Sequence, residues 1–123
     1  MVTVPVLFDT NILIDYLKGI EVARNEIDHY SDRAISLVTW MEVVVGATPA
    51  DESDVRSFLQ SFVILPIEQR TAEQAVVNRR GSRLKLPDAI ILAAAQVSGR
   101  LLITRNTRDF AAGTPGVRIP YTI

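Results

Sequence analysis

The sequence predicts an α/β fold, in which a mostly parallel sheet of four to five strands is covered by helices on both faces. Short apolar runs rich in β-branched residues alternate along the chain with stretches whose apolar residues recur at helical spacing. That alternation is typical of strand–helix–strand units, whose strands lie parallel. A length of 123 residues fits one domain, so we expect residues 1–123 to form a single domain.

Each predicted strand is a short apolar run that ends at a polar or helix-breaking residue. The first ends at Asp9, the third at Pro66 and the fourth at Thr104, whereas the fifth is expected to be a short edge strand. The predicted strands cover residues 4–8, 34–38, 63–65, 101–103 and 117–119.

The helices are predicted from apolar spacing together with start and stop signals. Thr39 and Glu42 have the spacing of a capping box, and so do Thr71 and Gln74. Gly99 follows the last helix, where glycine commonly ends one. The predicted helices cover residues 11–17, 20–30, 40–47, 51–61, 71–80 and 87–98.

Composition excludes several classes of protein. The chain has no cysteine, which rules out a disulfide framework and a thiolate metal site and agrees with the reducing cytoplasm, where we expect the protein. No basic segment followed by a longer apolar one begins the chain, so we expect no export signal. Its apolar runs are far shorter than the ~20 residues that span a bilayer, so we expect no membrane association.

The net charge of −1 hides an asymmetry between the two halves of the chain. Residues 1–54 carry ten acids and three bases, a balance of −7, and residues 55–123 carry four acids and ten bases, a balance of +6. A basic half can attract a polyanion such as a nucleic acid. Two solvated faces of opposite sign explain the pattern equally well.

Four acids stand at or near junctions between strands and helices: Asp9, Glu42, Asp88 and Asp109. The carboxyl ends of parallel strands meet at one edge of a sheet, so we expect these carboxylates to approach one another there. Asp88 reaches that edge only if its helix begins there and runs antiparallel to the next strand. Taken singly, each acid is explained better as a helix-capping or turn-capping residue.

The helix that carries Glu42 is apolar nearly all round, with Trp40, Met41 and residues 43–45 beside the acid. We therefore expect a partly desolvated carboxylate that needs a partner. The matching junctions offer no lysine, and the single histidine, His29, lies in a polar helix end where we expect it to be exposed. Carboxylates without adjacent bases suit Mg²⁺ or Mn²⁺, whereas the absence of cysteine disfavours zinc.

Four sequence blocks then resemble those of a known family. Residues 8–14 (FDTNILI), 36–43 (SLVTWMEV), 86–95 (LPDAIILAAA) and 102–110 (LITRNTRDF) are similar to the four signature blocks of PIN-domain ribonucleases. The blocks are closely similar to those of the VapC-type toxins of type II toxin–antitoxin pairs in bacteria and archaea. Each block is weakly specific alone, but four in this order are specific.

The resemblance implies a three-layer α/β/α sandwich and a Mg²⁺- or Mn²⁺-dependent endoribonuclease. It implies that Asp9, Glu42, Asp88 and Asp109 are the catalytic and metal-binding quartet. The family's polar accessory positions fall on Thr10, Asn11, Thr39, Thr104 and Asn106. It also implies two protein partners, a second copy of the chain and a cognate antitoxin whose tail blocks the acidic pocket. Apolar residues in 12–20 exceed what one buried face needs, which favours a partner surface there.

Basic residues flank two of the acids and predict contacts to RNA phosphates. A solvated helix end with favourable dipole placement explains the first four of them equally well. The candidates are Arg79, Arg80, Arg83 and Lys85 before Asp88, with Arg105 and Arg108 before Asp109.

Three other functions share features with this pattern. A phosphotransferase of the haloacid-dehalogenase type needs an acid at position 11, which is Asn11. A phosphoacceptor receiver domain needs an acid after the third strand and a lysine after a late one, where Pro66 and Arg105 stand. A non-catalytic RNA- or protein-binding domain on the same fold remains the alternative, although four intact acids argue against it.

Overall fold

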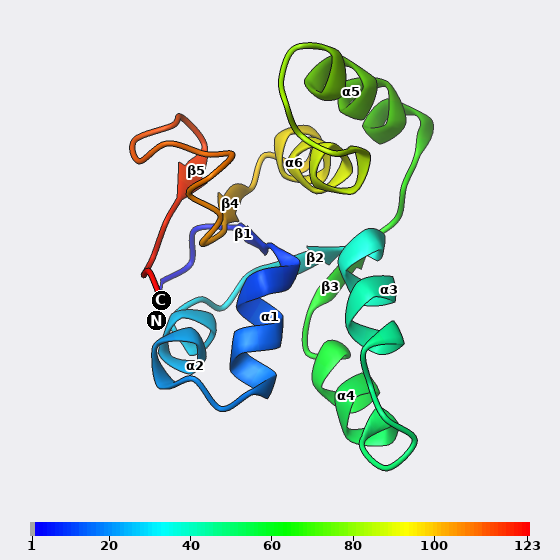
Figure 1. Ribbon diagram of the computed structural model, residues 1–123, viewed down its shortest axis with the longest axis vertical. Helices are drawn as coiled ribbons and strands as arrows, with labels where there is room; N and C mark the ends of the chain where they lie inside the picture. The colour runs from blue at the N-terminus through cyan, green and yellow to red at the C-terminus, as the bar shows by residue number, and fades with distance from the viewer. Residues whose placement is uncertain (1) are drawn as a thin grey trace.

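The computed structural model describes residues 2–123 and contains a five-stranded parallel sheet in the order β3-β2-β1-β4-β5. The predicted α/β fold with a parallel sheet is therefore confirmed. Figure 1 shows the sheet between two helical layers. The strands are β1 (Val6–Phe8), β2 (Arg33–Ser36), β3 (Val63–Leu65), β4 (Leu101–Ile103) and β5 (Val117–Arg118).

Two helices begin two or three residues earlier than the sequence predicts, and both predicted capping boxes are wrong. The third helix begins directly after Ser36, whose hydroxyl accepts a 3.2 Å hydrogen bond from the Val38 amide, so Thr39 is an interior helical residue. The fifth begins after Glu68, and no side chain caps it. The helices are α1 (Thr10–Leu17), α2 (Glu21–Asp28), α3 (Leu37–Val45), α4 (Glu52–Leu59), α5 (Gln69–Arg80) and α6 (Leu86–Ser98).

Alternation along β1 builds a core on each face of the sheet. Val6 and Phe8 point into one apolar core, formed with α1 to α4, while Leu7 points into the other, formed mainly with α6. All three side chains are fully buried, as expected of a central parallel strand flanked by helices on both sides. Figure 1 shows α1 to α4 on one side of the sheet and α6 on the other, with α5 outside α6.

The direction of α6 decides where Asp88 lies. Gly99 ends the helix in the left-handed conformation, at φ 67°, and lets the chain turn directly into β4. Because β4 runs back along the sheet, the start of α6 lies at the carboxyl edge of the strands. No helix within residues 2–123 is long and apolar enough to cross a membrane.

Candidate active site

Asp9 follows β1 directly and is the most buried of the four acids, with 6% of its surface exposed. Its Oδ1 accepts a 2.7 Å hydrogen bond from the Thr10 amide, which makes Asp9 the N-cap of α1. Its Oδ2 accepts a 2.7 Å bond from the Thr104 hydroxyl at the end of β4. The register of β1 beside β4 brings these two strand ends together.

Glu42 reaches the same edge from the second turn of α3. Its Oε1 accepts a 2.7 Å hydrogen bond from the Thr10 hydroxyl, and that hydroxyl lies 2.9 Å from the hydroxyl of Thr39. Two of the predicted accessory positions, Thr10 and Thr39, therefore tie α1 to α3 beside the acids.

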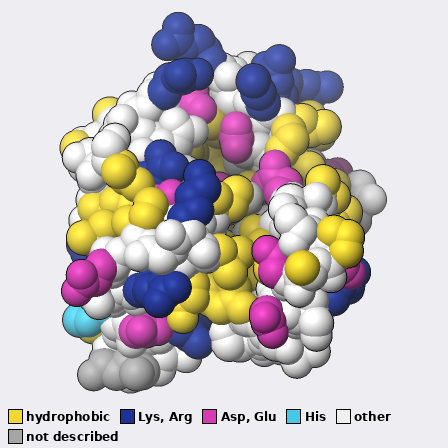
Figure 2. All heavy atoms as spheres, turned by 60° about the horizontal axis from the view of Figure 1, so that its bottom comes forward, with side chains coloured by type: hydrophobic (Ala, Val, Ile, Leu, Met, Phe, Trp, Pro, Cys, Tyr) yellow, Lys and Arg dark blue, Asp and Glu magenta, His cyan; other side chains and the backbone are white. Residues whose placement is uncertain are grey.

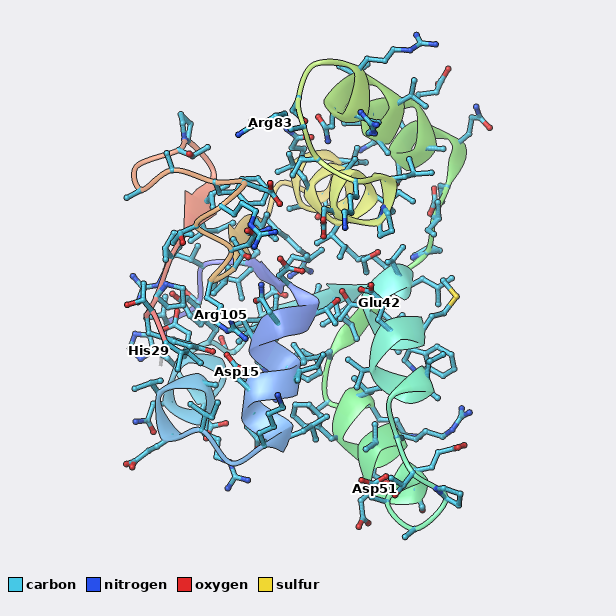
Figure 3. All side chains as sticks on the ribbon, in the orientation of Figure 1. Asp15, His29, Glu42, Asp51, Arg83 and Arg105 are labelled. Carbon is cyan, nitrogen blue, oxygen red and sulfur yellow. The ribbon has the colours of Figure 1, made fainter. Side chains whose placement is uncertain are left out.

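The expectation that Glu42 is desolvated is wrong, because its side chain is exposed. The apolar residues around it do not all face the core: Val43 is buried, but Val45 is 85% exposed. Figure 3 shows Glu42 at the end of α3 that lies nearest the start of α1.

Asp109 is held in the loop after β4 by Asn106. The Asn106 side-chain amide donates a 2.8 Å hydrogen bond to Asp109 Oδ2, and the Asp109 backbone amide donates a 3.2 Å bond back to Asn106 Oδ1. The backbone amide of Asn106 in turn donates to the Thr104 hydroxyl at 3.1 Å. Thr104 therefore contacts both the Asp9 carboxylate and the loop that carries Asp109.

Electrostatics shows that the four carboxylates share one neighbourhood. Burial raises the pKa of Asp9 to about 6, in spite of the hydrogen bonds from Thr104 and Thr10, and the charges of Asp88 and Glu42 raise it further. Burial also raises the pKa of Asp88, and the charges of Asp109 and Glu42 add to that rise. The structure thus brings together all four acids that the sequence singles out.

The carboxylates lie near enough to influence one another electrostatically without forming a closed cluster. Within residues 2–123, no three acidic or histidine side chains are placed to hold one metal ion together. Their donor set is nevertheless oxygen-only, which suits a hard divalent cation. Like charges repel, so the charges of Asp88 and Glu42 add to the rise in the pKa of Asp9 that burial causes.

Basic side chains border the acids on one side. A cavity of about 530 Å³ is lined by Asp88, Asp109 and Asn106 together with Arg83, Lys85 and Arg108. These three bases are exposed, and none forms an ion pair with the described residues. Figure 2 shows Lys and Arg side chains gathered at one end of the molecule beside acidic ones. Arg79 and Arg80 are exposed in the last turn of α5 and do not line this cavity.

Arg105 has a different environment from the other predicted phosphate-binding residues. Its Nε and Nη2 donate to the two carboxylate oxygens of Asp15 at 2.6 and 3.2 Å. Because this ion pair occupies the guanidinium, we do not retain Arg105 among the candidates for RNA contact. Figure 3 shows Asp15 and Arg105 side by side.

Asp15 and its second partner, Tyr121, are not predicted from the sequence. The Tyr121 hydroxyl donates a 2.8 Å hydrogen bond to Asp15 Oδ2. A signal for Asp15 is present, since it is the one acid inside the otherwise apolar stretch of residues 12–17. Nothing in the sequence pairs it with residues 90 and 106 positions further on.

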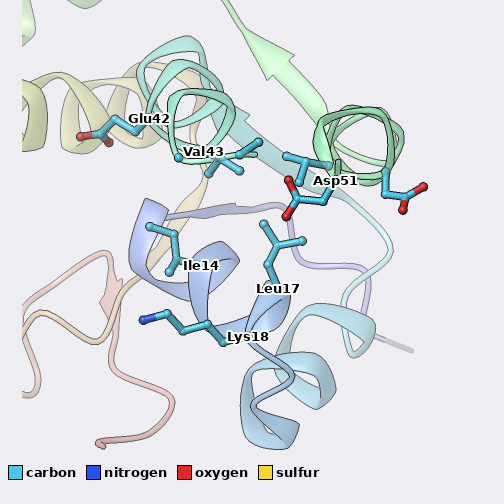
Figure 4. A pocket seen from close by; sticks show the side chains of 10 residues that line it. Ile14, Leu17, Lys18, Glu42, Val43 and Asp51 are labelled. Carbon is cyan, nitrogen blue, oxygen red and sulfur yellow. The ribbon is translucent and has the colours of Figure 1, made fainter. Parts of the chain in front are cut away.

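An apolar groove lies between α1, α3 and α4 and ends at Glu42 (Figure 4). Its volume is about 420 Å³, and its apolar walls include Ile14, Leu17, Val43 and Val55. Asp51 and Asp54 line it as well. The surplus of apolar residues predicted in the first helix therefore lies beside the acidic site.

Comparison with known proteins agrees with this geometry. The family model described as PIN domain matches residues 6–113. Ribonuclease VapC10 of Mycobacterium tuberculosis is 31% identical over 115 residues, which cover 85% of this chain and 85% of the relative.

Solved structures give the same result. A toxin–antitoxin complex from Klebsiella pneumoniae contains a chain that is 52% identical, with a TM-score of 0.91 over 96% of this chain and 99% of that one. DNA-bound VapBC from Salmonella typhimurium shares the fold at 24% identity, with a TM-score of 0.76 over 94% and 96% of the two chains. The resemblance of the four sequence blocks is thereby confirmed. The chain belongs to the PIN-domain family, among the VapC-type ribonucleases.

Proposed function

We propose that this protein is a metal-dependent endoribonuclease, the toxin of a toxin–antitoxin pair, and that Asp9, Glu42, Asp88 and Asp109 form its catalytic site. The proposal is supported by one observation: four carboxylates from four separate segments lie near the carboxyl edge of the sheet, where burial raises the pKa of Asp9 and Asp88 and the charges of neighbouring acids raise it further. That arrangement is costly for a fold and is typical of a site that binds a cation. The basic residues beside it favour a polyanionic substrate.

The donor chemistry fits Mg²⁺ or Mn²⁺, which prefer carboxylate oxygens. Such an ion would supply neutralisation of charge at the phosphoryl group and a lowered pKa for the attacking water. The open spacing of the acids is consistent with their mutual repulsion, which a divalent cation would remove. Asp9 is the central candidate ligand because it is the most buried of the four.

The residues of the chain have distinct roles in this proposal. Thr104 and the Thr10 amide orient the Asp9 carboxylate, while the Thr10 hydroxyl orients Glu42 and Asn106 orients Asp109. Arg83, Lys85 and Arg108 bind backbone phosphates of RNA without reading its bases. Arg79 and Arg80 are candidates for phosphates further along the strand.

The substitution Asp9→Asn tests the catalytic site. It should abolish Mn²⁺-dependent cleavage of RNA and the rise in melting temperature that Mn²⁺ produces, while circular dichroism remains that of the native fold. Asp28→Asn is the matched control, because Asp28 is 68% exposed in a loose 3.9 Å ion pair on α2. Retained cleavage by the Asp9 variant contradicts the proposal. A wild-type protein that binds RNA but shows no Mn²⁺ effect favours the alternative, a non-catalytic RNA-binding domain.

We also propose that a cognate antitoxin occupies the groove between α1, α3 and α4. The groove is apolar, and it leads from exposed side chains of α1 to Glu42 at the acidic site. A segment bound along it would therefore end at the acids and exclude RNA from them. The toxin–antitoxin complex from Klebsiella pneumoniae contains a similar chain. A homodimer, which the family resemblance implies, stays a prediction that light scattering can test.

A further inference from the structure

Asp15 is a buried carboxylate that the proposed chemistry does not use. Its side chain is 2% exposed and accepts three hydrogen bonds, two from the Arg105 guanidinium and one from the Tyr121 hydroxyl. A buried charge needs such partners, because an unpaired one is strongly destabilising. Burial and the Asp15 carboxylate both raise the pKa of Tyr121, which keeps its hydroxyl protonated as a donor.

The position of Arg105 in the chain gives this pair more than a packing role. Arg105 lies between Thr104, which donates to Asp9, and Asn106, which holds Asp109. Its own backbone amide donates a 3.4 Å bond to Asn11 Oδ1, and Asn11 Nδ2 donates to the Thr104 hydroxyl at 3.3 Å. The loop after β4 is therefore attached to α1 at both the backbone and the side chain of Arg105.

We propose that Asp15, Arg105 and Tyr121 form a positioning unit that holds the loop of residues 104–109 against α1 and so fixes Asp109 relative to Asp9. Without it, the loop keeps the bonds of Thr104 and Asn11 near the start of α1 and the backbone bond from the Thr104 amide to the Arg118 carbonyl of β5. The unit also connects residues 119–123 to the acidic site, since Tyr121 follows β5. This inference rests on the proposed function, in which Asp9 and Asp109 bind a common metal.

A matched pair of variants separates positioning from general stability. Arg105→Lys keeps the positive charge but loses the two-pronged contact to a carboxylate. Arg118→Lys makes the same change in an equivalent ion pair, in which Nε and Nη2 of Arg118 donate to Glu26 at 2.8 and 3.1 Å. That pair ties β5 to α2 through side chains that form no hydrogen bond to residues 104–109 among the described residues. The Arg118 backbone carbonyl does accept a 3.1 Å bond from the Thr104 amide, but a lysine at position 118 keeps that bond.

Two measurements on metal-free protein and on protein titrated with Mn²⁺ give the test. In Arg105→Lys, amide hydrogen exchange in residues 105–110 should accelerate, and Mn²⁺ affinity by titration calorimetry should fall on the order of ten-fold, as is usual when a residue supporting a metal ligand is lost. Arg118→Lys should lower the melting temperature without changing either quantity in the loop. Tyr121→Phe, which keeps the ring, should also accelerate loop exchange and weaken Mn²⁺ binding, but by less. It replaces Arg105→Lys in the test if that variant does not fold.

The outcomes distinguish the two proposals. Equal loop exchange and equal Mn²⁺ affinity in the Arg105 and Arg118 variants overturn the positioning unit. A wild-type protein that binds no Mn²⁺ overturns the proposed function, whereas accelerated loop exchange confined to Arg105→Lys and Tyr121→Phe still supports the unit.

Discussion

The hydroxyl of Thr104 donates a 2.7 Å hydrogen bond to the carboxylate of Asp9, which joins the ends of two neighbouring strands at the centre of the sheet. The same hydroxyl accepts from the Asn106 amide and from the Asn11 side chain. Thr104 is fully buried, so its hydroxyl has no water to replace these partners. One side chain thus connects β1, α1 and the loop that carries Asp109.

Replacement of Thr104 by Val should disturb Asp9 without unfolding the protein. The Thr104 hydrogen bond lowers the pKa of Asp9, so its loss should raise that pKa further and weaken Mn²⁺ binding at neutral pH. Partners left unsatisfied by the change cost about 1–3 kcal/mol of stability. Calorimetric Mn²⁺ titration and urea unfolding measure the two effects. Thr71→Val, at a buried threonine of α5, is the control, and equal Mn²⁺ affinity in both variants would contradict the assignment.

Mn²⁺ binding should weaken as the pH falls through about 6. Burial raises the pKa of Asp9 to about 6, so below that pH a proton competes with the cation for the carboxylate. Titration calorimetry at pH 5, 6, 7 and 8 should show rising affinity, and the binding heat should depend on the buffer because a proton is released. An affinity that is flat from pH 5 to 8 would count against Asp9 as a ligand.

The metal-free protein should lose stability as the pH rises through the same range. Because the pKa of Asp9 is about 6 in the folded state and has its ordinary value of 3.8 in the unfolded chain, the folded state binds more protons between those values. The stabilisation is complete below pH 3.8 and is lost above pH 6, a difference of roughly 3 kcal/mol. Asp9→Asn lacks this titration. Urea unfolding should therefore show that the stability of the variant relative to the wild-type protein is greater at pH 7.5 than at pH 4.5. A parallel pH dependence of the two proteins would exclude Asp9 as the cause.

RNA affinity should depend on the exposed bases around the cavity beside Asp88. Arg83→Gln and Arg108→Gln should each weaken binding, measured in EDTA to prevent cleavage, and each lost phosphate contact lowers the slope of log affinity against log salt by about 0.7. Arg56→Gln is the control, since Arg56 pairs with Glu52 on α4 at 2.9 Å. The role in RNA binding is contradicted if the Arg83 and Arg56 variants have the same salt slope.

Antitoxin binding should depend on the groove residues of α1. Leu17 is 40% exposed in the groove, so Leu17→Asp should leave folding intact but reduce co-purification with the cognate antitoxin. Val22→Asp is matched to it, because Val22 is 48% exposed on α2 and does not line the groove. Equal recovery of antitoxin with both variants would place the contact elsewhere.

Local sequence encodes the elements of this fold better than it encodes where the helices begin. Short apolar runs such as residues 6–8, and Gly99 after an apolar helix, are local signals, so the parallel sheet and the direction of α6 follow from the sequence. Helix starts are less well predicted. The spacing of acids and amides suggests Thr39 and Thr71 as N-caps, but the N-cap residues in the structure are Ser36 and Glu68.

The sequence by itself determined that Asp9 and Asp109 follow strands and that Glu42 and Asp88 lie near the starts of helices. The topology of a parallel sheet then brings these positions to one edge. Only the tertiary structure decided which side chains support them. The sequence predicts that Arg105 contacts RNA phosphates, but its guanidinium pairs with the buried Asp15, and Tyr121 joins them from beyond β5. The physical reason is that a buried carboxylate selects its partners by distance in space, and the partners of Asp15 lie 90 and 106 positions further along the chain.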